Sequence, residues 1–374
     1  MRTMAKSIMM ACVALTAAAC GATSADDNAQ TGQTTEGLTG PTGTGFFGSD
    51  TLFDAITAAV AASPAAGSLT YLGTGSGNGE KCLRGQPVSF NGATFCNGTQ
   101  DQSIAPMSRN LNTCQAGEVS HRIALDAIGL WSASGQNISD LSLQDVRNAF
   151  CGTDGSGSAA ACTVKTWGNL SNGASSTNPG NTIVKYRRDD VSGTTDTFKT
   201  ILTNNGLACT AFCSDVQIVV DSSSGPKLST DGATSSLQPP CTSTDSATDC
   251  IGRLTAASSN VLAYAGLGAT AKATPKALSV AGKTPTVPNI RALITAPSTA
   301  YAFARFLFIN ENTTSVRSSA ETKFFDWAFA KAPFGTAATS LTFETKLTNA
   351  GFIACTEPAV SGHKALDCGT GACP

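Results

Sequence analysis

The sequence predicts an α/β protein, in which strands and helices alternate along the chain. Short runs rich in apolar and β-branched residues, such as residues 216–220, are typical of strands. They alternate with runs whose apolar residues recur at helical spacing. With 374 residues, 41% of them hydrophobic, the chain is long enough to bury a large core and to form two lobes or domains.

The charge of the chain argues against one class of partner. Only 13% of the residues are charged and the formal net charge is −2, so the chain lacks the basic field that attracts nucleic acids or anionic membrane surfaces. We therefore expect no nucleic-acid partner.

The amino terminus is similar to an export signal. Residues 1–6 are basic, and residues 8–19 form an apolar run that is too short for a mature membrane span. Small residues directly before Cys20 resemble a bacterial lipobox, so we predict a signal peptide over residues 1–20 and a lipid on Cys20. The alternative is a plain signal peptide that is cleaved nearby. Residues 21–42 hold hardly any large apolar side chain, which predicts a flexible tether.

The cysteine content predicts disulfides. Without Cys12 in the signal and Cys20 on the lipid, twelve of the fourteen cysteines remain, an even number in an exported protein. Their connectivity stays open, and sequence-near pairings are Cys151 with Cys162 and Cys241 with Cys250. We predict no metal site, because no Cys-x-x-Cys pair occurs and the chain has only two histidines.

The first candidate helix covers residues 52–62. Ser49 or Asp50 can cap it, which leaves the N–H groups of its first turn as free donors. Residues 68–72 form a candidate strand that runs into the glycine-rich residues 73–79. This segment lacks the lysine of a nucleotide P-loop and the spacing of a dinucleotide fingerprint, and it is typical of a flexible connection.

The middle of the chain holds a buried strand and a capped helix. Residues 123–130 are apolar on both faces, which is typical of a strand buried within a parallel sheet. Ser142 can cap a helix that places Leu143, Val146 and Phe150 on one face, and we expect these three side chains in the core.

The same patterns predict the remaining elements. Candidate strands are residues 102–106, 182–186, 216–220, 260–266 and 301–310, candidate helices are residues 195–202 and 319–330, low-complexity stretches are residues 152–180 and 222–250, and a cysteine-rich tail covers residues 355–373. We expect the strand over residues 260–266 to return to the first lobe and the helix over residues 319–330 to end the fold.

The most informative stretch is residues 187–198, which joins a candidate strand to a candidate helix. It places Ser192, Gly193 and Thr194 at a helix amino terminus, where backbone N–H groups lack partners and the helix dipole is positive. A small anion fits there, and Arg188 can add a guanidinium that binds two oxygens of one oxyanion. The alternative is an ordinary helix cap that follows a solvated basic pair.

Residues 188–194 read Arg-Asp-Asp-Val-Ser-Gly-Thr, which resembles the Arg-x-Asp-x-Ser-Gly-Thr motif of the phosphate-binding proteins of phosphate ABC transporters. That family belongs to the type II periplasmic binding proteins. Weaker matches are residues 48–52, 71–77 and 105–108, and the order of later elements through residues 325–327 and 350–352. The resemblance covers about residues 43–352, with the cysteine-rich loops as insertions.

The resemblance implies two α/β lobes with mostly parallel sheets and a hinge between them. It assigns residues 43–122 and 260–352 to lobe 1 and residues 123–259 to lobe 2. Residues 353–374 remain as the cysteine-rich tail.

The resemblance also implies a ligand set and no catalytic residue, metal or cofactor. The phosphate contacts carried over are Thr51, the N–H of Leu52, Ser76, Arg188, Ser192, Gly193 and Thr194. Asp190 would pair with Arg188 and orient it. A buried oxyanion needs such fixed donors, because it has lost its hydrogen bonds to water. Thr51 and Ser76 also fit the ordinary roles of cap and loop residues.

One position departs from the family pattern. The family has an Asp two residues before Pro106, where its carboxylate accepts the proton of phosphate, and this chain has Ile104 instead. An acceptor there distinguishes protonated phosphate from sulfate, so the preferred oxyanion stays open. We hypothesise that Asp50, next to Thr51, supplies the acceptor. The alternative is that Asp50 only caps its helix.

The leading hypothesis is an exported lipoprotein, periplasmic or at the cell surface, that binds phosphate between two lobes and delivers it to an ABC-transporter permease. One alternative is a surface or matrix protein that keeps the fold but serves adhesion or signalling, and another is a binder of a different tetrahedral oxyanion. An enzyme such as a phosphatase has the least support, since the sequence offers no metal-ligand cluster and no His near Ser192.

Overall fold

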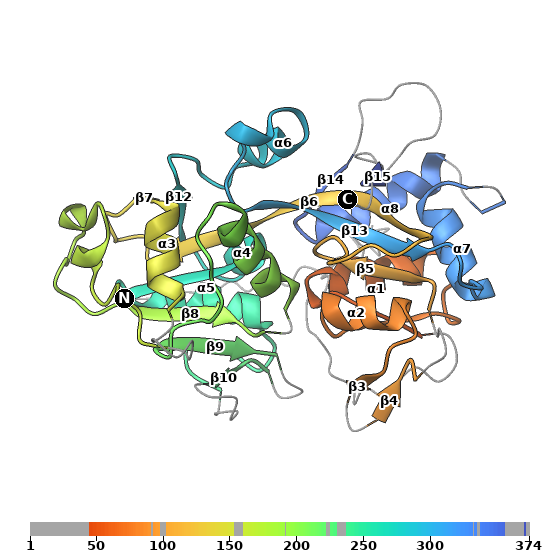
Figure 1. Cartoon of the computed structure of the whole chain (residues 1–374), viewed down its shortest axis with the longest axis horizontal. Helices are drawn as coiled ribbons and strands as arrows, with labels where there is room; N and C mark the ends of the chain where they lie inside the picture. Colours follow the sequence, from red (N-terminus) through yellow and green to blue (C-terminus); the bar gives the residue numbers. More distant parts are fainter. Residues whose placement is uncertain are drawn as a thin grey trace, which may run out of the picture. The chain divides into compact units, whose positions relative to one another are not determined.

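The computed structural model describes residues 45–90, 93–97, 102–152, 160–190, 192–221, 225–229, 237–331, 333–334, 337–355 and 370–371. The predicted signal peptide, Cys20, the tether and most of the tail lie outside these residues. Strands and helices alternate through the described chain, which confirms the α/β class (Figure 1). None of the helices in this part is long and apolar enough to cross a bilayer.

The largest sheet is built around β6 (Glu118–Ser132), a strand of 15 residues. Its antiparallel partners include β11 (Val261–Gly266), β12 (Lys276–Val280) and β13 (Ala304–Asn312). Parallel pairs in the same sheet join β8 (Val184–Arg188) to β9 (Val216–Val220) and to β11. The sheet is therefore mixed, and the expectation of a mostly parallel sheet is wrong. That expectation came from a strand that is apolar on both faces, a pattern that indicates burial but not the direction of the neighbouring strands.

Shorter strands extend this sheet or form small ones. The additions are β5 (Ile104–Met107) on β13, β7 (Asp140–Leu141) on β12, β10 (Lys227–Ser229) on β9, and β14 (Ile353–Ala354) and β15 (Thr370–Gly371) on β6. The small sheets are the parallel pair of β1 (Gly45–Gly48) with β2 (Thr70–Gly73) and the antiparallel pair of β3 (Val88–Phe90) with β4 (Ala93–Phe95).

Half of the eight helices in the described chain begin at a serine whose side chain caps them, namely Ser142, Ser192, Ser246 and Ser318. They are α1 (Phe53–Ala62), α2 (Ser76–Leu83), α3 (Leu143–Phe150), α4 (Gly193–Asn204), α5 (Ala247–Ala257), α6 (Val287–Thr295), α7 (Ser319–Ala328) and α8 (Ala337–Asn349). The Ser142 side chain accepts the Asp145 N–H at 3.0 Å and completes a capping box, as the sequence predicted for α3. One expectation is wrong: α7 does not end the fold, since α8 follows it. In addition, α5 begins within residues 222–250, which the sequence marked only as a low-complexity stretch, and extends beyond them.

The buried side chains form two principal hydrophobic clusters. The cluster that we call the first core includes Phe46, Leu52, Ile56, Ile309, Phe324 and Trp327. The cluster that we call the second core includes Val146, Phe150, Phe198, Leu202 and Tyr264, with Leu143 packed against it. The three side chains of α3 predicted to be in the core therefore pack there.

The strands β6 and β13 contribute to both cores. In β6, Ile123 and Ala124 lie in the first core, whereas Leu125, Ala127, Ile128 and Leu130 lie in the second. In β13, Ala304 lies in the second core and Leu307 in the first. The two strands pair side by side, so they are continuous connections between the cores (Figure 1).

The strand β11 does not return to the first lobe as expected. It is hydrogen-bonded between β8 and β6, and its side chains join the second core and a neighbouring cluster. The apolar pattern predicts that this segment is a strand, but pairing with β8 depends on residues far away in sequence.

The disulfides correct one of the two illustrative pairings. Cys241 is bonded to Cys250 as predicted, but Cys151 is bonded to Cys209 and Cys162 to Cys213. A backbone bridge between Cys151 and Phe212 brings the segment after α4 against the end of α3, so nearer cysteines in sequence are not nearer in space. A further bond joins Cys82 to Cys96.

Candidate anion-binding site

The amino terminus of α4 lies directly after β8, as the sequence predicted. Ser192 caps the helix, and its side chain accepts the Thr194 N–H at 3.3 Å. The Asp189 carboxylate accepts the Ser192 N–H at 2.8 Å. Ser192 and Thr194 are buried, so this helix start faces the interior of the protein.

Two further turns begin close together beside the first core. Ser49 caps the short turn that leads into α1, and Ser76 is the first residue of α2. The glycine-rich residues 73–79 are thus not only a flexible connection, because α2 starts inside them. Ser108, which follows β5, accepts a hydrogen bond from the Ser49 hydroxyl at 3.0 Å, donates its N–H to the Ser76 oxygen at 3.1 Å, and places its hydroxyl 3.3 Å from that oxygen.

These turns meet the start of α4. The hydroxyl oxygens of Thr51 and Thr194 are 3.4 Å apart. A Cβ atom added to Gly193 would lie 1.9 Å from the Ser108 hydroxyl and 2.7 Å from that of Ser76, so only glycine allows this approach. The structure therefore brings together five of the residues that the resemblance assigns to the ligand: Thr51, Ser76, Ser192, Gly193 and Thr194.

Leu52, whose N–H was also assigned to the ligand, uses that N–H within its own turn. The N–H donates to the Ser49 carbonyl at 3.2 Å, and the Leu52 side chain is buried in the first core. Leu52 thus anchors the turn that carries Thr51.

Arg188 is buried among carboxylates. Its Nη2 donates to Asp50 at 2.5 Å and to Asp221 at 2.9 Å, while its Nη1 donates to the Thr248 hydroxyl at 2.9 Å. Burial lowers the pKa of Arg188, but the charges of Asp50, Asp221 and Asp189 outweigh burial and raise the pKa above its ordinary value. The guanidinium is therefore held in the charged state.

The pairing predicted for Asp190 is wrong. Its carboxylate binds Arg187, with Nη2–Oδ2 and Nη1–Oδ1 distances of 2.9 and 3.1 Å, and it accepts from Lys199 at 3.4 Å. Successive strand residues point to opposite faces, so Arg187 and Arg188 diverge. Arg187 stacks on the Phe212 ring at 4.0 Å, on the side where Asp190 lies.

The carboxylates around Arg188 outnumber it, and two of them, Asp189 and Asp221, have raised pKa values. Burial, together with the charges of Asp50 and Asp221, raises the pKa of Asp189 to about 6 against the opposing charge of Arg188. Burial likewise raises the pKa of Asp221. The site therefore combines strong donors with acids that hold protons more tightly than usual.

Arg305 on β13 was not predicted as a site residue. Its Nη2 donates to the Thr194 hydroxyl at 3.1 Å and its Nη1 to the Gly193 carbonyl at 3.3 Å, and it is paired with Asp126. The signal was available in the sequence, because a lone arginine in the apolar run over residues 301–310 needs a buried partner.

Ile104, at the position where the family has an Asp, is fully buried in the first core. No acceptor is available from this side chain. Any acceptor for a ligand proton must come from another residue.

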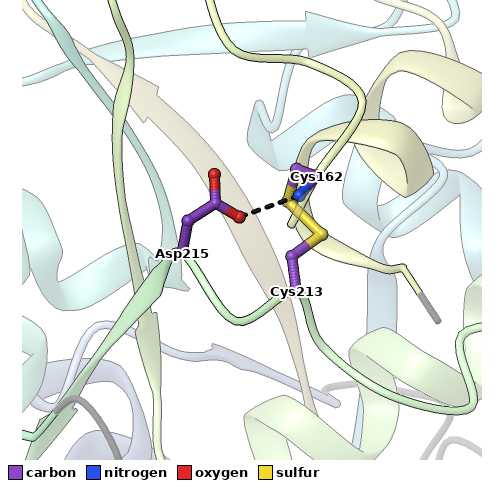
Figure 2. Close-up of side chains that lie close together, drawn as sticks. All are labelled: Cys162, Cys213 and Asp215. Atoms are coloured by element: carbon purple, nitrogen blue, oxygen red, sulfur yellow. Dashed lines mark hydrogen bonds between the residues drawn. A yellow bond between two sulfur atoms is a disulfide. The ribbon is translucent and has the colours of Figure 1, made fainter. Parts of the chain in front are cut away.

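Cys162, Cys213 and Asp215 are the side chains, within the described part of the chain, whose spacing would suit a metal ion (Figure 2). The two sulfurs are joined in a disulfide, so neither is a thiolate that can bind metal. Asp215 accepts the Cys162 N–H at 2.9 Å and pairs with Lys185 and Lys165 at 2.9 and 3.2 Å. The cluster is better explained as a structural feature, in which the disulfide and the contacts of Asp215 hold neighbouring segments together.

Comparison with solved structures identifies the fold. A structure from Clostridium perfringens, described as a substrate-binding protein of a phosphate ABC transporter with bound phosphate, matches 84% of this chain and 100% of its own, with 16% identity and a TM-score of 0.55. An ABC-type phosphate transport receptor from Vibrio cholerae matches 83% of this chain and 99% of its own, with 14% identity and a TM-score of 0.52. At these identities the likeness establishes the two-lobed fold of periplasmic binding proteins. No protein-family model and no curated protein sequence matches the chain.

Proposed function

We propose that the protein is a non-enzymatic solute-binding protein that holds phosphate, or a related tetrahedral oxyanion, where its two cores meet. The observation that carries the proposal is the meeting of three element starts, with Thr51 at one, Ser76 at the second and Thr194 at the third. Helix starts offer unpaired N–H groups and a positive dipole, which suit a small anion.

The proposed contacts are Thr51, Ser76, Arg188, Ser192, Gly193 and Thr194. The N–H of Leu52 would join them only by sharing or leaving the Ser49 carbonyl to which it now donates. Hydroxyl groups can turn from one another to a ligand oxygen at little cost, since each is both donor and acceptor. Arg188 would contribute through a guanidinium that Asp50 and Asp221 already hold in place.

We also propose that Asp50 accepts a hydrogen bond from the protonated oxygen of the ligand. One of its oxygens binds Arg188, and the other, Oδ1, is buried with no hydrogen-bond partner among the described residues. A buried oxygen in that condition is costly unless a donor reaches it, and a protonated oxyanion carries such a donor. Sulfate carries none, so this geometry supports a preference for phosphate.

Transport is the wider part of the proposal. The two matched solved structures come from phosphate transport systems, which supports delivery of the ligand to an ABC-transporter permease. Export and lipidation at Cys20 rest on the sequence of the amino terminus. A surface protein that retains the fold but has another role is the alternative, and it would bind no phosphate.

Calorimetry with the purified protein tests the proposal. We expect phosphate to bind, and Thr194→Val, which keeps the shape but loses the hydroxyl, to weaken binding at least about tenfold, the value of a hydrogen bond to a charged group. Thr203→Val, at an exposed position of the same helix, is the matched control and should bind normally. No heat with phosphate, or equal binding by both variants, would contradict the proposal.

A further inference from the structure

We propose that Arg305 and Asp126 form a positioning pair, which orients the Thr194 hydroxyl and ties ligand binding to the two strands that connect the cores. The inference rests on the proposed function, because it concerns the same anion. It adds a residue pair that acts through Thr194.

The pair sits at the crossover between the cores. Arg305 and Asp126 are directly opposite each other in the β13–β6 ladder, and they are 4% and 2% exposed. On β13 the core changes beside Arg305, between Ala304 in the second core and Leu307 in the first. On β6 it changes just before Asp126, between Ala124 and Leu125. A change in the angle between the cores must therefore bend the ladder close to this pair.

The pair is also oriented toward the anion site. Asp126 Oδ2 accepts from Arg305 Nε at 3.0 Å and Nη2 at 2.6 Å, which fixes the plane of the guanidinium. In that plane Nη1 and Nη2 reach Gly193 and Thr194, in the first turn of α4.

The direction of the hydrogen bond determines what Thr194 can do. A guanidinium only donates, so the Thr194 oxygen accepts from Arg305 and its own proton must point elsewhere. Thr51 Oγ1 lies 3.4 Å from that oxygen, on the other element start. Arg305 thus leaves the Thr194 hydroxyl free to donate its proton toward the candidate anion site, where the three element starts meet.

The electrostatics favour an anion as a further partner. A cation beside a helix amino terminus is unfavourable, because the helix dipole is positive there. Asp126 neutralises Arg305 from the side of β6, through Nε and Nη2. An oxyanion at the start of α4 would be stabilised by the dipole and the guanidinium together, and it would link α4 to β13.

A double-mutant cycle on phosphate affinity tests the inference. Arg305→Lys keeps the charge beside Asp126 but loses the fork, so it should fold normally and bind phosphate several-fold to about tenfold more weakly. Because Arg305 acts through Thr194, the double variant Arg305→Lys/Thr194→Val should lose little more phosphate affinity than the weaker-binding single variant. Arg84→Lys is the control, since Arg84 forms a similar pair with Glu118 on β6, with an Nε–Oε1 distance of 2.7 Å.

Small-angle scattering with and without phosphate supplies a second readout. We expect wild type and Arg84→Lys to become more compact with phosphate, and Arg305→Lys to do so less even at saturation. Additive effects in the cycle, or equal affinity and compaction in Arg305→Lys, would overturn the inference while leaving the proposed function intact. Absence of phosphate binding by the wild type would overturn both.

Discussion

Asp50 has its two carboxylate oxygens in different surroundings. One binds Arg188, and the other is buried without a hydrogen-bond partner among the described residues. The position that carries the acceptor in the phosphate-binding proteins is the apolar Ile104 in this chain. We therefore propose Asp50 as the residue that distinguishes protonated from fully ionised oxyanions.

We therefore predict that Asp50→Asn lowers the ratio of phosphate to sulfate affinity by at least about tenfold, because the amide replaces an acceptor with a donor. Competition calorimetry measures the ratio. Asp140→Asn, at a carboxylate of β7 that accepts the Gly282 N–H, should leave it unchanged. An unchanged ratio in Asp50→Asn would return Asp50 to the role of a helix-start residue.

Asp189 should make stability depend on pH. Its pKa in the folded protein, about 6, lies above the ordinary 3.8, because of burial and the nearby charges of Asp50 and Asp221. Its stabilising contribution is therefore complete below about pH 4 and is lost as the pH rises through 6. Asp189→Asn keeps an acceptor for the Ser192 N–H. Because an amide does not ionise, this variant should not lose stability as the pH rises through 6.

We expect Asp189→Asn to raise the free energy of unfolding at pH 7.5 by on the order of 2–3 kcal/mol, and by less at pH 4.5. Urea unfolding across that range measures the difference. Asp145→Asn should do the opposite: burial raises the pKa of Asp145, but hydrogen bonds from Ser171 and Ser142 outweigh burial and lower it overall. Parallel pH profiles for wild type and Asp189→Asn would contradict the prediction.

At this scale the sequence predicts residue types better than partners. The motif around Arg188 and Ser192 marks an anion site because caps and glycines act locally. Which of two consecutive arginines meets Asp190 depends on what covers each face of β8, and that information is distant in sequence. Arg305 stands out as a lone arginine in an apolar run, but the sequence does not show that its partner is Asp126, which lies on another strand.

At the scale of elements, the site depends on how closely the starts of helices approach one another. Gly193 allows α4 to come against Ser108 and Ser76. Gly268 is a useful comparison, because an added Cβ there would meet only Thr248, at an ordinary 3.7 Å.

We predict that Gly193→Ala weakens phosphate binding strongly and lowers the free energy of unfolding by about 1–3 kcal/mol, as overpacking does. Ser108→Ala in the same chain removes the oxygen that the new Cβ would strike and should restore part of the stability. Gly268→Ala should change neither property by much. Thermal unfolding with calorimetry measures both, and a tolerated Gly193→Ala would disprove the close approach.

The starts of α3 and α4 were predictable from the sequence, whereas the starts of α2, α5 and α8 and the pairing of the strands were not. Ser142 and Ser192 carry short-range capping signals, so α3 and α4 begin where expected. The direction of the partners of β6 and the position of β11 depend on contacts between distant segments. The apolar pattern alone could not distinguish an antiparallel strand shared by both cores from a buried parallel one.

At the scale of the molecule, the resemblance predicted the two-lobed fold, and the matched structures agree. The sequence alone predicted only an α/β class with room for two lobes. The sequence did not predict how the two cores are joined. A long apolar strand has the same residue pattern whether its side chains pack in one core or in two.

That shared strand has a consequence for unfolding. Neither core keeps its full set of side chains if β6 or β13 is lost, so one core cannot melt while the other remains complete. We predict a single cooperative transition in scanning calorimetry, with equal calorimetric and van't Hoff enthalpies. Two resolved transitions would contradict this. The two lobes should therefore be one thermodynamic unit.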